Sequence, residues 1–367
     1  MFVTAIVFIA ILSVLVMIHE LGHYTVARLF GVHVEEFGFG LPPRIFGKKI
    51  KGTMYSFNWL PIGGFVKLAG EDEEDVDREK GKIKSETERS KYFWAKSRGQ
   101  RALILSAGVC MNFLLAVVLT TVLLTRGITE PTKIVHVETV SANSPAALAG
   151  LKEKDVISSI QYTDKTGLQI KKLQEPQELI DIVKGQSGTS ITLAIVRDGK
   201  PMTVHLVPRV SPPQGEGPLG VAVSNLEKHK YPLSKAPFMA VKINVERMWM
   251  MLTSLGSVIS KLITGQKLAS GEISGPIGIA QVTGQAVKYG FDAVLEFMAI
   301  LSLNLALLNI LPFPALDGGR LAFVIADKFG KKARPAVERV IHQVGMIILM
   351  ALILLVTVND ILRIVRG

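Results

Sequence analysis

The sequence is poor in cysteine and in charged residues. Cys110 is the single cysteine among 367 residues, so the chain can form neither an intramolecular disulfide nor a cysteine-rich metal site. Charged residues make up 20% and aromatic residues 7% of the chain, whereas hydrophobic residues reach 49%. The mean hydropathy is +0.36, and the apolar residues are gathered in long runs, which is typical of membrane proteins. Any metal site must use histidine and carboxylate side chains.

The positive charge does not indicate a nucleic-acid partner. Lys and Arg number 42 against 31 Asp and Glu, which gives a formal net charge of +11. The basic residues are spread along the chain and alternate with acidic ones, as in residues 71–101. Basic loops beside a lipid bilayer account for the excess, and we expect no binding of nucleic acid.

Four apolar runs are long enough to cross about 30 Å of hydrocarbon as helices, which takes about 20 residues. They cover residues 3–29, 102–125, 293–311 and 343–358. The first run has neither a basic start nor a small-residue cleavage pattern, so we expect it to be retained in the protein.

A further apolar stretch, residues 237–265, is interrupted near its start by Lys242, Glu246 and Arg247. Its hydropathy is compatible with a fifth span or with an amphipathic helix on the membrane surface.

Between the second and third runs, residues 126–212 have the pattern of a small soluble α/β domain. Residues 133–140 and 190–196 have strand composition, and residues 175–184 have helical spacing. Residues 144–157, SPAALAGLKEKDVI, resemble the segment of PDZ domains in which a short helix leads through Gly-Leu to an Asp at a strand start. The composition of residues 208–217 predicts a linker after this domain.

The strongest chemical signal lies in the first apolar run, where His19, Glu20 and His23 form the pattern HExxH. Residues four apart share one face of a helix, so both imidazoles can bind one Zn²⁺ while Glu20 acts on a metal-bound water. Three ionisable side chains in or beside hydrocarbon are costly unless something binds them, which argues against an incidental polar helix end. Two histidines leave a catalytic zinc short of one protein ligand.

The candidate for the third ligand is Asp317, in the segment NILPFPALDGG at residues 309–319. Pro312 and Pro314 break the third apolar run, which lets a carboxylate bend into the protein interior. Taken alone, the same residues are ordinary material for a helix-terminating turn.

In combination, HExxH and NxxPxPxLDGG resemble the site-2 protease family of intramembrane zinc metalloproteases, close to its regulator-of-sigma-E protease type. The likeness extends over nearly the whole chain and includes VEEFGFG, LPIGGFVKL and SGPIGIA at residues 34–40, 60–68 and 274–280. Two features depart from the family pattern. Residues 107–112 read AGVCMN without the common proline, and one PDZ-like domain is found where many relatives carry two.

The sequence and this resemblance together predict a polytopic α-helical membrane protein. It has four transmembrane helices, a re-entrant β-hairpin and an inserted extracytoplasmic PDZ-like α/β domain. The expected divisions are the first two helices with the β-loop, the PDZ-like domain, a linker with a surface helix, and the last two helices. They correspond to residues 1–125, 126–212, 213–290 and 291–367.

The re-entrant hairpin is expected at residues 53–68. Tyr55, Phe57 and Trp59 alternate with polar residues in strand fashion, and Gly63 and Gly64 allow a close backbone approach. An exposed strand edge there could pair with an unwound substrate, and the family has a re-entrant β-structure at this place. A simple cytoplasmic hairpin is the alternative.

A shared zinc restricts the topology. His19 lies about 27 Å along the first helix, near its far end, and Asp317 follows the third run. With four crossings these two helices run in the same direction, which brings the ligands to one depth. A fifth crossing at residues 237–265 would separate them, so we expect a surface helix there.

The basic residues then predict the orientation. Arg98 and Arg101 precede the second run, and six Lys or Arg lie within residues 318–340. The positive-inside rule places both ends in the cytoplasm. The N-terminus and the PDZ-like domain are expected outside a bacterial inner membrane, with the active site towards the cytoplasm.

The predicted function is intramembrane proteolysis of single-span membrane proteins by a zinc endopeptidase. His19, His23 and Asp317 would hold the zinc, and Glu20 would serve as general base and then acid. The family pattern suggests Asn309 as an oxyanion donor, although it could instead cap the backbone freed by the prolines. Further candidates for contacts with the substrate or oxyanion are Asn304, Asn112, Gly63 and Gly64.

The resemblance suggests an anti-sigma factor or a remnant signal peptide as the substrate. An inactive membrane adaptor, whose PDZ-like domain binds peptide tails, is the alternative from another class. The intact HExxH and LDG motifs favour the protease, because an adaptor needs no buried ligands. A metal transporter would need more polar residues in the second and fourth runs, which supply almost none apart from Asn112.

Overall fold

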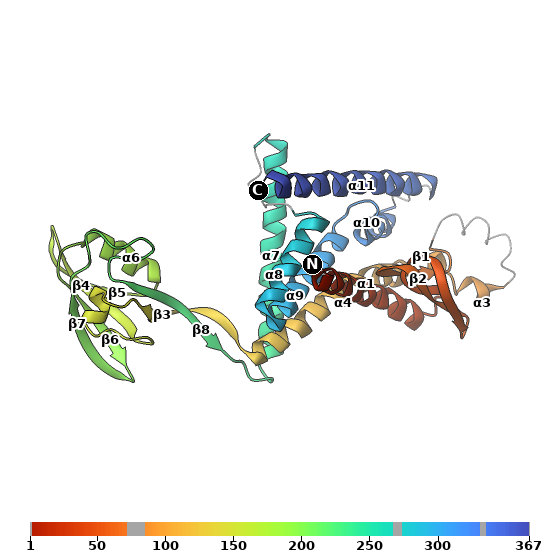
Figure 1. Ribbon diagram of the computed structural model, residues 1–367. Helices are drawn as coiled ribbons and strands as arrows, with labels where there is room; N and C mark the ends of the chain where they lie inside the picture. The colour runs from red at the N-terminus through yellow and green to blue at the C-terminus, as the bar shows by residue number, and fades with distance from the viewer. Residues whose placement is uncertain (1, 72–84, 267–273, 331–334, 367) are drawn as a thin grey trace. The chain divides into compact units, whose positions relative to one another are not determined.

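The computed structural model describes residues 2–71, 85–266, 274–330 and 335–366 (Figure 1). The chain divides into a helical unit, Met1–Thr125 with Tyr231–Gly367, and a β-rich unit, Arg126–Lys230. The β-rich unit is an insertion in the helical one. The Tyr231 N–H donates to the Leu124 carbonyl at 3.0 Å, so the helical unit is continuous across the insertion.

Four helices of the described chain are long and apolar enough to cross a membrane. They are α1 (Phe2–Leu29), α4 (Arg98–Arg126), α9 (Phe291–Ile310) and α11 (Pro335–Arg366). The prediction of four such helices is confirmed. The fourth is longer than residues 343–358, because polar residues continue the helix beyond both ends of the apolar run.

Three of these apolar helices, α1, α4 and α9, pack against one another through two small buried clusters. Ile11 and Leu15 of α1 form a buried cluster with Leu301 of α9. Ala116 of α4 packs against Ala299 and Leu303 of α9. Helix α11 is the least buried of the four.

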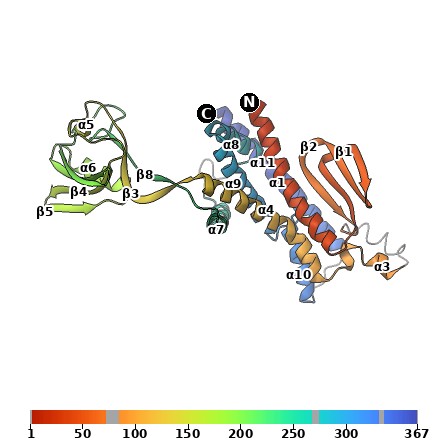
Figure 2. The same cartoon turned by 90° about the horizontal axis from the view of Figure 1, so that it is seen from below.

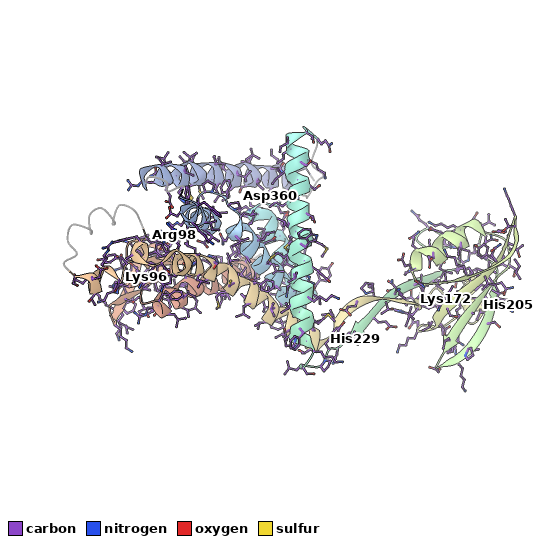
Figure 3. All side chains as sticks on the ribbon, turned by 180° about the vertical axis from the view of Figure 1, so that it is seen from behind. Lys96, Arg98, Lys172, His205, His229 and Asp360 are labelled. Carbon is purple, nitrogen blue, oxygen red and sulfur yellow. The ribbon has the colours of Figure 1, made fainter. Side chains whose placement is uncertain are left out.

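Helix α8 (Pro276–Tyr289) is joined to α11 by a buried carboxylate. Asp360 of α11 is 1% exposed and accepts a 2.7 Å hydrogen bond from the Gly278 N–H in the first turn of α8 (Figure 3). This side chain therefore caps α8, whose own N-cap residue is a glycine.

Helix α7 (Ala236–Ile263) covers the region where a surface helix, rather than a fifth span, was expected. It runs across the direction of α1 and α4, since Figure 2 shows it end-on where those two are seen along their length. Its buried face carries Asn244, which donates to the Thr120 hydroxyl at 3.1 Å. Its neighbouring face exposes Val241, Val245 and Trp249.

Strands β1 (Val34–Ile50) and β2 (Thr53–Leu68) form an antiparallel hairpin that folds back on itself. Residues 34–39 pair with residues 64–68 on one side, and residues 36–39 pair with residues 54–57 on the other. Residues 53–58 also pair with residues 44–50, so Tyr55 and Phe57 lie inside the sheet. Of the segment predicted to offer an edge, only residues 60–68 do so.

Shorter helices complete the helical unit. They are α3 (Glu86–Arg89), the 3₁₀ turn η1 (Phe93–Ala95) and α10 (Asp317–Lys328). Part of the charged loop at 71–101, residues 72–84, lies outside the described residues, as do Lys331, Lys332 and Arg334.

The β-rich unit has the sheet order β7-β6-β4-β3-β8, with β5 paired to β4. Its elements are β3 (Ile128–Val140), α5 (Pro145–Leu148), β4 (Val156–Asp164), β5 (Gly167–Lys172), α6 (Pro176–Gly185), β6 (Ile191–Arg197), β7 (Lys200–Leu206) and β8 (Val221–His229). Ile157, Ile160, Leu179 and Leu193 lie in its core.

Strand β8 lies beyond the range 126–212 expected for this domain. It pairs with β3 from Val221 to His229, so the compact unit continues to Lys230. The proline-rich residues 208–217 form a loop within the unit, where the Arg209 N–H donates to the Pro218 carbonyl at 2.9 Å.

Asp155, the Asp of the PDZ-like segment, forms a buried ion pair with Arg197. It is 1% exposed and accepts hydrogen bonds of 2.7 and 2.6 Å from the Arg197 guanidinium. Burial raises the pKa of Asp155, but the bonds from Arg197 and from the Lys152 N–H outweigh burial and hold it below its usual range. The carboxylate therefore stays ionised at neutral pH.

Candidate metal centre

Three side chains from distant parts of the chain converge at one point. His19 and His23 lie one turn apart on α1, with their Nε2 atoms 3.2 Å apart. Asp317, the first residue of α10, places Oδ2 2.9 Å from His19 Nε2 and 3.2 Å from His23 Nε2. Within the described ranges, no other group of three His, Cys, Asp or Glu side chains converges in this way. The structure thus brings together the three predicted ligands.

Contacts on the far side of each imidazole determine which nitrogen faces the centre. His23 Nδ1 lies 2.8 Å from the Ile104 carbonyl oxygen, which can only accept, so this nitrogen carries the proton. His19 Nδ1 lies 3.3 Å from the Asn112 amide. Asn112 is completely buried, and its Oδ1 has no partner in the described part of the chain. Rotating the amide lets Oδ1 accept from His19 Nδ1–H.

Both histidines then direct an Nε2 lone pair at the Asp317 carboxylate. Because each of these three atoms offers a lone pair, a cation such as Zn²⁺ between them would satisfy all three at once. A tetrahedral Zn²⁺ with bonds of about 2.0 to 2.1 Å has its ligand atoms about 3.3 Å apart. The separations of 2.9 to 3.2 Å fit a metal of this kind. This donor set leaves one tetrahedral position for a water.

Two glycines allow α1 and α4 to approach closely at this point. A Cβ on Gly22 would lie 2.5 Å from the Ala107 carbonyl oxygen of α4. A Cβ on Gly108 would lie 2.5 Å from His23 Nε2 and 2.6 Å from His19 Cε1. Gly108 belongs to the AGVCMN segment, and the sequence reasoning assigned it no role. Its position directly against both imidazoles shows why a side chain is excluded there.

Asp317 is positioned by a tight turn between α9 and α10. Helix α9 ends at Ile310, where the prolines begin, and Ala315 has a φ of +79°. The Gly319 N–H donates to the Leu316 carbonyl at 3.0 Å, which starts α10 at Asp317. Gly318 and Gly319 pack against the carbonyls of Leu311 and Phe313, which leaves no room for a Cβ.

Glu20 lies beside the converging atoms and contacts the β-hairpin. Its Oε2 accepts a 2.9 Å hydrogen bond from the Val66 N–H of β2. It also lines a pocket together with Val16, His19, Asn112, Leu305, Asn309, Ala315, Leu316 and Asp317. The contact with Val66 had no signal in the sequence.

Of the other predicted residues, two line the pocket and three do not. Asn309 and Asn112 line the pocket, and Asn112 also faces His19. Asn304 does not line this pocket among the described residues. Gly63 and Gly64 lie on β2 against Val16 and Met17 of α1.

Comparisons with known proteins cover almost the entire chain. The sequence pattern of peptidase family M50 matches residues 7–352. The regulator of sigma-W protease RasP of Bacillus subtilis is 32% identical, and the match covers 98% of each chain. Zinc metalloprotease RasP of Geobacillus kaustophilus is 28% identical over 425 aligned residues, with 96% of each chain covered. Among solved structures, the PDZ domain of an SdrC-like protein from Listeria innocua is 19% identical with a TM-score of 0.20, and the match covers 27% of this chain and 97% of that one.

Gly108→Ala should lower the amount of Zn²⁺ bound per purified chain, because the new methyl group collides with both imidazoles. Gly99→Ala, on the same helix with nothing within 4 Å of its Cβ, is the matched control and should bind as the wild type does. Elemental analysis of the dialysed proteins measures the difference. Equal zinc in both variants would contradict the close approach of α4 to the histidines.

Proposed function

The chain belongs to peptidase family M50, and we propose that His19, His23 and Asp317 hold the Zn²⁺ with which it hydrolyses peptide bonds. The resemblance found in the sequence is thereby confirmed, and the protein is an intramembrane zinc metalloendopeptidase. The observation that carries the residue assignment is the convergence of these three side chains in one pocket with Glu20. An inactive adaptor would have no use for it.

Each residue of the pocket has a separate task. Zn²⁺, when bound, acts as a Lewis acid and makes water a better nucleophile near neutral pH. Glu20 takes the proton of the attacking water and passes it to the leaving nitrogen. Asn309 is our candidate donor to the oxygen of the scissile carbonyl. Asn112 is fully buried beside His19, so we assign it to orienting that imidazole.

The β-hairpin is the candidate for a re-entrant element. The Ser13 hydroxyl, near the middle of α1, donates to the Pro61 carbonyl at 2.9 Å. This end of the sheet exposes Trp59 and Leu60 by 69% and 51%. The other end carries the Lys51–Gly52 turn, which lies near His33, after α1 has ended. An apolar end beside the middle of a spanning helix and a basic end beyond it support insertion into the bilayer.

The edge formed by residues 60–68 is where we expect the substrate to bind. A transmembrane helix hides its carbonyls in its own hydrogen bonds, so it must unwind before water can attack. Strand addition would hold the unwound segment in extended form. The Val66 N–H of this edge bonds to Glu20 and the Pro61 carbonyl bonds to Ser13, so an added strand would take the place of these contacts and would lie next to the base. The substrates are single-span membrane proteins of the anti-sigma factor or remnant signal peptide class.

The ends of the helical unit support the predicted orientation. Lys96 and Arg98 lie at the end that carries the β-hairpin (Figure 3). Arg101 of α4 pairs with Asp327 of α10 at 3.2 Å, so the start of α4 and the end of α10 lie together. We assign this basic end to the cytoplasm and the β-rich insertion, at the opposite end of α4, to the outside. Helix α7 would then lie on the outer surface with Trp249 in the interface.

The β-rich unit contributes none of the converging side chains, and we assign it to substrate selection. Its residues 144–157 resemble a PDZ segment, and PDZ domains bind peptide tails by strand addition.

Glu20→Gln should lower the rate at which a membrane substrate is cleaved by at least about 100-fold, while the purified protein keeps its zinc. The amide cannot take a proton from water, but Glu20 is not a ligand. Asp317→Ala is the contrasting variant and should lose zinc as well. Cleavage by Glu20→Gln at the wild-type rate would refute its assignment as the base.

Photo-crosslinkers at Lys67 and at Lys49 distinguish the two edges of the sheet. A substrate trapped by the Glu20→Gln enzyme should crosslink to the position at Lys67, beside the edge that faces Glu20. The position at Lys49 lies on residues 44–50, the opposite edge, and serves as the control. Equal capture at both positions would argue against strand addition at residues 60–68.

Removal of residues 127–229 with a short glycine linker should change which substrates are cut. Because Tyr231 bonds to Leu124, the linker has only a short gap to bridge. We expect a pre-trimmed single-span substrate to be cut at nearly the normal rate, while discrimination against untrimmed substrates is lost. Loss of all activity in a deletion protein that still binds zinc would contradict a selective role.

The orientation has its own test. Protease added outside intact spheroplasts should digest the β-rich unit of the full-length protein.

A further inference from the structure

The turn that carries Asp317 is held from outside by α11. The Ala315 N–H donates to Nδ1 of His342 at 3.0 Å. One turn further along α11, Gly345 packs against Pro314 so closely that a Cβ would overlap it. These two contacts join residues 314–315, directly before Asp317, to a helix that is otherwise the least buried of the four apolar ones.

Ala315 needs such support because of its backbone conformation. Its φ of +79° is in the left-handed region, which residues with a Cβ rarely occupy. The hydrogen bond to His342 is the one that the Ala315 N–H makes. Without it, the turn would lose a contact that holds this conformation two residues before Asp317.

His342 acts as a hydrogen-bond acceptor through Nδ1. A backbone N–H can only donate, so Nδ1 must be unprotonated and the proton lies on Nε2. Nε2 is buried and has no partner within the described chain. An unpartnered buried donor is costly, and an apolar residue would avoid it. The imidazole also packs on Phe323 of α10, with ring centroids 5.5 Å apart, so it contacts the chain on both sides of Asp317.

We propose that His342 is a positioning residue for Asp317: its Nδ1 holds Ala315 in the left-handed conformation and thereby fixes the carboxylate opposite His19 and His23. The inference rests on the proposed function, in which Asp317 is a metal ligand. It assigns a task in the metal centre to a residue outside both the HExxH and the LDGG motifs. Helix α11 is then part of the machinery that shapes the site.

The test uses the full-length protein with Co²⁺ in place of zinc, because the visible absorption of Co²⁺ reports its coordination. His342→Ala should shift the absorption bands and weaken Zn²⁺ binding, measured by chelator competition, by about 10-fold. His342→Asn places an amide oxygen near the position of Nδ1 and should restore most of both. Gln343→Ala, the exposed neighbour on α11, is the matched control and should behave as the wild type.

Gly345→Ala provides a second approach if His342→Ala does not fold, because its methyl group would displace Pro314, the other contact between α11 and this turn. It should change the Co²⁺ spectrum in the same direction. Asp317→Ala separates the two hypotheses. An unchanged spectrum in Asp317→Ala would refute the ligand set itself. A changed spectrum there, with wild-type spectra and affinities in His342→Ala and Gly345→Ala, or equal defects in His342→Ala and His342→Asn, would overturn the positioning role.

Discussion

The convergence of three lone-pair donors, from two distant parts of the chain, in one partly buried pocket determines how the surrounding helices and turns are arranged. The ligand atoms of His19, His23 and Asp317 lie 2.9 to 3.2 Å apart, a spacing that a cation between them would satisfy. Glycines at the contact between α1 and α4 leave room for the two imidazoles. Any side chain at Gly108 would overlap them. Outer contacts with Ile104 and Asn112 then keep both Nε2 lone pairs directed inwards.

The same constraint explains why distant elements meet at the centre. Asp317 comes from a turn that breaks the third apolar helix, and α11 supports that turn through His342 and Gly345. On the other side of α1, the hairpin lies along the helix from Ser13 to Glu20. Helix α1 thus carries both histidines and Glu20, and it packs against the strand edge at which we propose that the substrate binds. Substrate binding and hydrolysis can therefore occur within a few residues of each other.

Much of the centre could be predicted from the sequence, because its ligands lie in short patterns with fixed spacing. HExxH places two imidazoles on one helix face, and hydropathy identifies the four apolar helices. Contacts between distant residues leave no such pattern, which is why the roles of Gly108, Val66 and His342 emerged only in three dimensions. Composition also misled, since the prolines of residues 208–217 indicated a domain end although β8 follows them within the same sheet. In the hairpin, alternation identified strands but could not show that Tyr55 and Phe57 have partners on both sides.

The proposed zinc site can be located directly with an anomalous difference map recorded at the zinc absorption edge from crystals of the full-length protein. We expect one strong peak within about 2.0 to 2.2 Å of His19 Nε2, His23 Nε2 and an Asp317 carboxylate oxygen. A peak bound to the histidines but distant from Asp317, or a peak at other residues, would contradict this ligand set.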